Sequence, residues 1–173
     1  MSKIEQLIKE LCPNGVEYKR LDSCCNILDN KRKPVTKSER QSGKYPYYGA
    51  NGVQDYVSDY IFDGNFVLVG EDGSVITSNG TPVVIWAEGK IWVNNHAHIL
   101  EAKEQKNLEF IFHTLKKIAV VKIETGSIQK KINQENLLNV KIIIPSLHIL
   151  DKFSEIVKPN LLSFICTISI LSV

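Results

Sequence analysis

The sequence predicts an α+β fold: one domain with a mostly antiparallel or mixed twisted sheet and a few helices. Between residues 56 and 100, short β-prone runs alternate with turn residues, whereas apolar residues at helical spacing are confined to residues 4–11, 108–118 and 147–157. The 173 residues suit a single domain. Hydrophobic residues make up 43% and charged residues 23%, which excludes a disordered, collagen-like or coiled-coil chain.

The chain is expected to open with a helix and a strand. Ser2 and Glu5 form a capping-box pattern ahead of apolar residues at helical spacing, and the Pro-Asn-Gly of residues 13–15 ends that helix. Alternation over residues 16–21 indicates a first strand. Residues 29–54 are polar and rich in proline and glycine, so we expect a long loop there, and loops of this length are usually functional.

Turn residues divide the β-prone region into short strands. Asp-Gly-Asn at residues 63–65 separates two runs, and Glu-Gly at residues 88–89 predicts a two-residue hairpin turn between two more. Asn-Gly-Thr-Pro at residues 79–82 predicts another turn.

The following segment is expected to contain two helices and two strands. Asn107 is a candidate cap for a helix whose apolar residues, up to Ile118, share one face. We then expect a strand at 120–123, a turn at 126–129, a short helix at 133–139 and a buried strand at 142–144.

The C-terminal residues change character. Ser146 is expected to cap a helix that stops at Lys158, before Pro159. Residues 161–173 are apolar and uncharged, as either a frameshifted remnant or a final core strand would be. This run is too short to cross a bilayer as a helix, which takes about 20 residues, and residues 1–11 lack a signal-peptide core. The four cysteines form no Cys-x-x-Cys pair. We therefore expect a soluble, reduced, cytoplasmic protein.

Positive charge is concentrated in one segment. The formal net charge of +2 is too balanced to indicate a nucleic-acid-binding protein by itself. Six cations nevertheless fall within residues 31–44, opposed only by Glu39, and a second basic patch includes residues 130–131. Such cations can bind phosphates, and nearby tyrosine and asparagine side chains can reach base edges. A solvated polar loop is the alternative.

Two patterns could carry metal chemistry. His96 and His98 would share one face of a strand, but no third ligand lies at suitable spacing, so no metal site is expected. Asp72 followed by Glu88 and Lys90 is similar to the layout of many Mg²⁺-dependent nucleases, in which carboxylates hold the metal and a lysine assists the attacking water. The predicted hairpin turn is the competing explanation of Glu88. We expect no catalytic residue.

Five segments in order resemble the specificity subunit of type I restriction-modification systems. They are GKYPYYGANG (43–52), DYIFDG (59–64), VGEDG (69–73), WVNNHAH (92–98) and TGS (125–127) with 129–140. The opening CPNGVEYKRL of residues 12–21 is also similar to the usual start of such a chain.

This resemblance implies a non-catalytic DNA target-recognition domain over residues 1–145, a truncated spacer helix over 146–158 and an atypical apolar tail over 159–173. In that family two such domains, separated by two long helices, read the two halves of a bipartite site. The implied partners are double-stranded DNA, the methyltransferase (modification) subunit, the motor-nuclease (restriction) subunit and a second recognition half. The chain would hold no cofactor, because the partner subunits use S-adenosylmethionine, ATP and Mg²⁺.

The chain departs from the family pattern in having one recognition domain and a short spacer helix. A truncated copy, a recombination cassette, a half-subunit that dimerises and a non-functional fragment all remain open. For a working domain we expect recognition in a DNA groove, although residues 43–52 could instead pack the fold. The expected DNA-binding residues are Lys31, Arg32, Lys33, Lys37, Arg40, Lys44, Tyr47, Tyr48, Asn51, Ser74, Asn79, Lys130 and Lys131.

Overall fold

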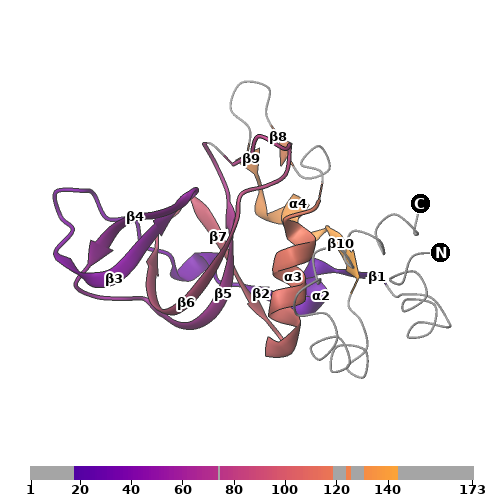
Figure 1. Ribbon diagram of the computed structural model, residues 1–173, viewed down its shortest axis with the longest axis horizontal. Coiled ribbons are helices and arrows are strands. Elements are labelled where there is room, and N and C mark those ends of the chain that lie inside the picture. The colour runs from indigo at the N-terminus through magenta and orange to yellow at the C-terminus, as the bar shows by residue number, and fades with distance from the viewer. Residues whose placement is uncertain (1–17, 74, 119–123, 126–130, 144–173) are drawn as a thin grey trace. The chain divides into compact units, whose positions relative to one another are not determined.

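The computed structural model describes residues 18–73, 75–118, 124–125 and 131–143 (Figure 1). The chain divides into two compact units, one of residues 20–140 and one of residues 1–19 with 141–173. Strands β1 (Tyr18–Arg20) and β10 (Lys141–Ile143) form a two-stranded sheet. The predicted N-terminal helix, the spacer helix of residues 146–158 and the tail of residues 159–173 lie outside the described residues.

A six-stranded mixed sheet organises the larger unit. Its order is β2-β7-β5-β6-β3-β4, and every neighbouring pair is antiparallel except β3 and β6, which are parallel. This confirms the predicted fold class. The strands are β2 (Cys25–Ile27), β3 (Ser42–Gly49), β4 (Gly52–Val57), β5 (Phe62–Gly70), β6 (Val84–Val93) and β7 (Ala97–Ala102).

Short helices and one small sheet complete this unit. They are α2 (Leu21–Cys24), η1 (Asp29–Lys31), η2 (Gln105–Asn107), α3 (Leu108–Leu115) and α4 (Gln134–Leu138), with β8 (Glu124–Thr125) paired to β9 (Lys131–Ile132). Helix α3 contacts β5 and β6 (Figure 1), and the Phe112 ring meets Trp86 edge to face at 5.8 Å between centroids. Within the described residues, no helix is long and apolar enough to cross a membrane.

Helices α3 and α4 begin in different ways. The short helix predicted over residues 133–139 is present as α4, and the Asn133 side chain caps it by accepting a hydrogen bond of 2.7 Å from the Asn136 amide. Asn107 does not cap α3, because it already has helical backbone angles as the last residue of η2. Leu108, Ile111 and Leu115 are fully buried, which confirms the apolar face predicted for α3.

Two predicted turns are wrong because long strands continue through them. Strands β5 and β6 pair without interruption from Phe62–Ile91 to Val69–Val84, and Gly64 lies opposite Gly89 in this register. The φ angles of Gly64 and Gly89 are +149° and +76°, conformations that other residues rarely adopt. The glycines are thus needed for local geometry, but the extended ladder keeps the chain in strand conformation. The turn predicted at residues 79–82 is present two residues earlier, at 77–80, where the Gly80 amide donates to the Thr77 carbonyl at 3.0 Å.

The long loop predicted over residues 29–54 is only partly present. Residues 32–41 are irregular, but β3 and β4 form a hairpin over residues 42–57. Ser42 and Tyr45 both pair with Val57, so β3 carries a bulge that takes up Gly43 and Lys44. Glycine and proline obscured this strand in the sequence. In the structure β3 lies between β4 and β6, and burial of its Tyr47 and Tyr48 side chains stabilises it.

Candidate nucleic-acid interface

Within residues 31–44, four of the predicted DNA-binding cations have exposed side chains. Lys31 is the last residue of η1, Lys33 and Lys37 lie on the irregular segment after it, and Lys44 lies at the bulge of β3. Exposed lysines on such a segment can contact DNA phosphates, which neutralises charge without specifying sequence. We call these four residues the exposed lysine set.

Arg32 does not join the exposed lysine set. Its side chain is 13% exposed, and its Nη1 donates to Glu71 Oε2 at 2.6 Å and to the Ala97 carbonyl at 2.9 Å. Its Nε donates to the Asp29 carbonyl at 3.1 Å. The guanidinium therefore holds the irregular segment against β7, and its donors are directed into the protein.

Arg40 also bonds within the protein. Its guanidinium carbon lies 4.1 Å from the centre of the Tyr47 ring, its Nε donates to the Val35 carbonyl at 3.1 Å, and its Nη1 donates to Asp55 Oδ2 at 3.3 Å. The Tyr56 amide and this guanidinium hold the pKa of Asp55 below its usual value.

The two tyrosines predicted to reach DNA lie in the interior. Tyr47 is 1% exposed, and its hydroxyl donates to the carbonyl of Val35 and accepts from the amide of the same residue. Tyr48 belongs to the hydrophobic core cluster, and burial raises the pKa of its hydroxyl. These positions support the alternative in which the tyrosines pack the fold.

The other predicted residues lie at several places. Asn51 is exposed in the turn between β3 and β4, and Asn79 is exposed in the turn of residues 78–80. Lys131 is exposed on β9, where its Nζ lies 3.8 Å from Asp72 Oδ2. Ser74 and Lys130 lie outside the described residues.

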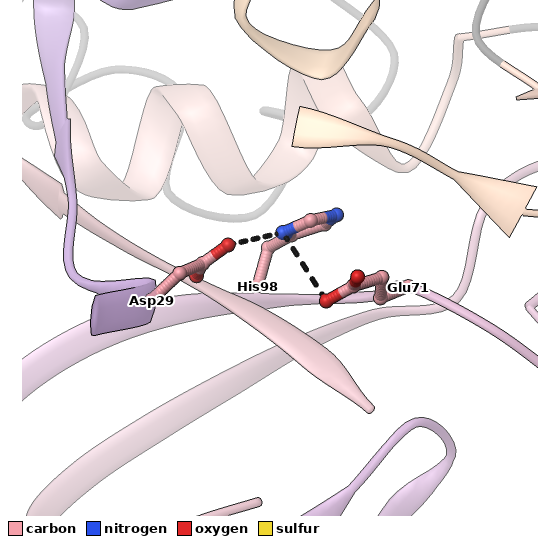
Figure 2. A group of neighbouring side chains, drawn as sticks. All are labelled: Asp29, Glu71 and His98. Atoms are coloured by element: carbon pink, nitrogen blue, oxygen red, sulfur yellow. Dashed lines mark hydrogen bonds and ion pairs between the residues drawn. The ribbon is translucent and has the colours of Figure 1, made fainter. Parts of the chain in front are cut away.

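A partly buried charged network includes residues next to Lys31 and Lys33 in the chain, and the sequence patterns did not indicate its members together. Figure 2 shows Asp29 and Glu71 converging on one ring nitrogen of His98, which is 1% exposed. His98 Nδ1 lies 2.5 Å from Asp29 Oδ2 and 3.8 Å from Glu71 Oε2, and His98 Nε2 lies 2.6 Å from the Ile132 carbonyl oxygen. With Arg32, these side chains form what we call the His98 network.

The hydrogen-bond partners of His98 favour a proton on both ring nitrogens. A carbonyl oxygen can only accept, so Nε2 must carry a proton, and the ionised Asp29 likewise requires a proton on Nδ1. Burial by itself lowers the pKa of His98, but the Asp29 hydrogen bond and charge, the Ile132 carbonyl and the Glu71 charge together raise it above its ordinary value. The contacts around the ring therefore favour the imidazolium form of His98.

The His98 network is built as an ion-pair cluster. Asp29, Glu71 and His98 each offer one atom that could bind a metal ion, and these three atoms lie within 4.8 Å of one another. That spacing suits a metal ion. Both ring nitrogens of His98 already lie at hydrogen-bond distance from protein oxygens, however, and Arg32 already bonds to Glu71. The two histidines do not share one strand face as predicted, because His96 lies in the turn before β7 and its Nδ1 lies 2.5 Å from Asp72 Oδ1.

The residues of the nuclease alternative are not gathered into one site. Glu88 and Lys90 lie on β6, so the predicted turn does not explain them, and Glu88 pairs with Asn65. Asp72 lies beyond Gly70 at the end of β5, and the five steps along the strand from Asn65 to Gly70 span roughly 17 Å. The Lys90 ammonium lies 4.6 Å from the centre of the Tyr60 ring instead.

Comparison with known proteins identifies the family. Residues 13–160 match the model of the type I restriction modification DNA specificity domain. The chain belongs to this family. A Haemophilus influenzae protein assigned as a type I restriction enzyme specificity subunit is 43% identical over 152 residues, which is 88% of this chain. The EcoprrI specificity subunit of Escherichia coli is 26% identical over 141 residues. The resemblance stated from the five segments is thus confirmed.

The specificity-domain chain is much shorter than these relatives. It spans 38% of the Haemophilus influenzae protein and 32% of the Escherichia coli protein. Its fold is similar to that of a type I restriction-modification S subunit from M. genitalium, with a TM-score of 0.62 at 17% identity over 91% of this chain and 39% of that one. The HsdS subunit from Thermoanaerobacter tengcongensis gives a TM-score of 0.51 at 16% identity over 98% of this chain and 45% of the other.

Proposed function

We propose that this specificity domain binds double-stranded DNA sequence-selectively and itself breaks no bond. The observation that carries the proposal is the family match over residues 13–160. The structure adds a segment of exposed lysines that internal arginine contacts hold in place. Phosphate contacts fix register, and contacts to base edges select sequence.

The exposure pattern divides the proposed roles among the residues. The exposed lysine set and Lys131 would contact phosphates, whereas Asn51 and Asn79 present amides suited to base edges from exposed turns. Ser74 and Lys130 remain proposed contacts from the sequence. Arg32, Arg40, Tyr47 and Tyr48 would act indirectly by supporting this surface.

The proposed partners follow from the family. Specificity would be conferred on a methyltransferase (modification) subunit and a motor-nuclease (restriction) subunit in the cytoplasm, and a second recognition half would complete a bipartite site. S-adenosylmethionine, ATP and Mg²⁺ would be used by those partners. A solved structure that concerns complex assembly of the type I system gives a TM-score of 0.54 to this chain at 15% identity.

Selection from a random duplex pool tests the proposal. The full chain, alone and with the methyltransferase subunit of its own system, should enrich one half-site sequence. A folded chain that enriches nothing in either arm would contradict sequence-selective binding.

The role of the lysines is tested on the selected duplex. Substituting Lys31, Lys33 and Lys37 with alanine should weaken binding across all sequences and reduce the salt slope by about 1 for each phosphate interaction that the substitutions remove. Lys106→Ala is the control. Lys106 follows Ala102, the last residue of β7, which lies roughly 17 Å along the strand from Ala97, where Arg32 is anchored. An unchanged salt slope in the triple variant would remove these lysines from the interface.

A further inference from the structure

We propose that His98, as a buried imidazolium, is a positioning residue that ties two basic segments, residues 31–37 and β9, to one end of the central sheet. The link to DNA binding rests on the proposed function, because both segments carry lysines proposed to contact phosphates. The positioning itself rests on the hydrogen bonds of the His98 network.

The first segment is attached through Asp29 and Arg32. Asp29 Oδ1 accepts from the Ile99 amide at 3.0 Å while Asp29 Oδ2 accepts from His98 Nδ1, so one carboxylate bonds to two residues of β7. Arg32 Nη1 reaches the carbonyl of Ala97 on the same strand. Lys31 lies between these two anchors, and Lys33 follows them directly.

The second segment is attached through Ile132, which is fully buried. Its amide donates to the Glu71 carbonyl at 2.9 Å, and its own carbonyl accepts from His98 Nε2. The preceding residue, Lys131, forms a β-bridge with Asp72. His98 therefore bonds to each segment with a different ring nitrogen, while Glu71 contacts the same two segments through Arg32 and the Ile132 amide.

Charge balance favours a proton on both ring nitrogens of His98. The groups facing the ring are the Asp29 carboxylate from η1, the Glu71 carboxylate after β5 and the Ile132 carbonyl from β9, and Arg32 bonds to Glu71. With His98 protonated, two cations offset two carboxylates. A neutral ring keeps one proton, so either Asp29 or Ile132 would face a lone pair and one segment would lose its bond.

Nitrogen-15 NMR of the full chain tests the protonation state directly. Both ring nitrogens of His98 should show bound protons at pH 6.5, and the ring should titrate above the ordinary histidine pKa of about 6.5. A neutral ring with one protonated nitrogen at pH 6 would overturn the proposal. This measurement needs neither DNA nor a variant.

Amide hydrogen exchange tests the attachment of the two segments. In His98→Gln, the single side-chain NH₂ group cannot reproduce both bonds, so protection of the Ile132 or Ile99 amide should fall at least about tenfold. His96→Gln is the matched control, because it removes an exposed histidine–aspartate pair two residues away and should change protection by less than about twofold. Unchanged protection in a folded His98→Gln protein would contradict the attachment.

A pH series on the wild type covers the case in which His98→Gln does not fold. Protection at Ile132 or Ile99, corrected for the intrinsic exchange rate, should fall as the pH rises through the titration of His98, while protection of Val67 in the middle of the sheet persists. Protection at both amides that is independent of this titration would contradict a role for the proton.

Duplex binding separates this inference from the proposed function. Wild-type affinity should decrease as the pH rises through the His98 titration, whereas His98→Gln should bind about tenfold more weakly with a flat pH profile. Absence of wild-type binding would remove the proposed function and leave the NMR and exchange tests to decide the positioning. Parallel pH profiles in the two proteins would overturn the role of His98 in DNA binding.

Discussion

The indole N–H of Trp92 donates to the backbone carbonyl of Lys33 at 2.7 Å. This bond joins β6 to the segment that carries the exposed lysines, at a point 59 residues away in sequence. The Trp92 ring also lies 6.5 Å from Tyr47, whose hydroxyl bonds to Val35 on the same segment. The backbone of the irregular segment is thus attached to the sheet even though its lysine side chains are exposed.

Removing this bond should weaken the fold modestly. Trp92→Phe retains an aromatic ring and deletes the donor, so the free energy of unfolding should fall by about 1 kcal/mol. Urea denaturation would show a lower midpoint with an unchanged slope. An unchanged midpoint would mean that water replaces the indole without cost.

Removing the Asp29 charge should have a larger effect, because its side chain is only 8% exposed and faces His98 and Arg32. Asp29→Asn leaves those buried cations without their carboxylate, which should lower the free energy of unfolding by about 3–5 kcal/mol. Asp22→Asn, in the exposed pair with Arg20, is the control and should leave the denaturation midpoint almost unchanged. Equal small effects would contradict the importance assigned to the His98 network.

Stability should depend on pH through His98. Its folded-state pKa lies above the unfolded value of about 6.5, so its contribution is fully present below pH 6.5 and is lost as the pH rises through the folded pKa. The difference in unfolding free energy between wild type and His98→Gln should therefore shrink with increasing pH. A difference that grows over the same window would contradict the assigned proton.

His113 should make stability depend on pH in the direction opposite to His98. Partial burial lowers its pKa, Lys116 and Lys117 lower it further, and Glu109 opposes them. The contribution of His113 to the free energy of unfolding is therefore present above about pH 6.5, and it is lost as the pH falls through the lowered pKa of the folded state. His113→Phe should remove this loss of stability on acidification, measured as a flatter midpoint between pH 6.5 and pH 5. A wild-type acid slope retained in the variant would assign the effect to other groups.

Two glycines of β3 should differ in their tolerance of alanine. A Cβ on Gly43 would meet the backbone of Val57 and Ser58, whereas a Cβ on Gly49 would meet only the side chain of Gln54. Gly43→Ala should lower the free energy of unfolding by about 1–3 kcal/mol, because backbone must move to admit the methyl group. Thermal denaturation of both variants would check this, and a more damaging Gly49→Ala would contradict it.

Local sequence patterns predicted elements whose stability comes from their own residues. The apolar spacing of Leu108, Ile111 and Leu115 is visible within two helical turns. The continuity of β5 through Gly64 was not visible, because it depends on pairing with β6 over its whole length. Turn propensity at a glycine pair is a local preference that the ladder overrides.

The site was harder to predict, because charge alone does not distinguish a surface cation from an internal one. Arg32 and Lys33 are neighbours, yet Glu71, 39 residues away from Arg32, decides that the arginine turns inward. Asp29 and His98 are separated by 69 residues, so no spacing rule connects them. Partners brought together by the sheet therefore determine which members of a basic segment remain available.

Such a domain could acquire a new target through its exposed positions alone, because its arginines support the fold while its lysines face solvent. Positions 31, 33, 37, 51 and 79 are exposed, whereas the anchoring contacts come from Arg32, Arg40 and the main chain of Lys33. Randomising the five exposed positions while keeping the two arginines should yield a library of folded proteins with altered sequence preference. Retargeting would then require no redesign of the interior.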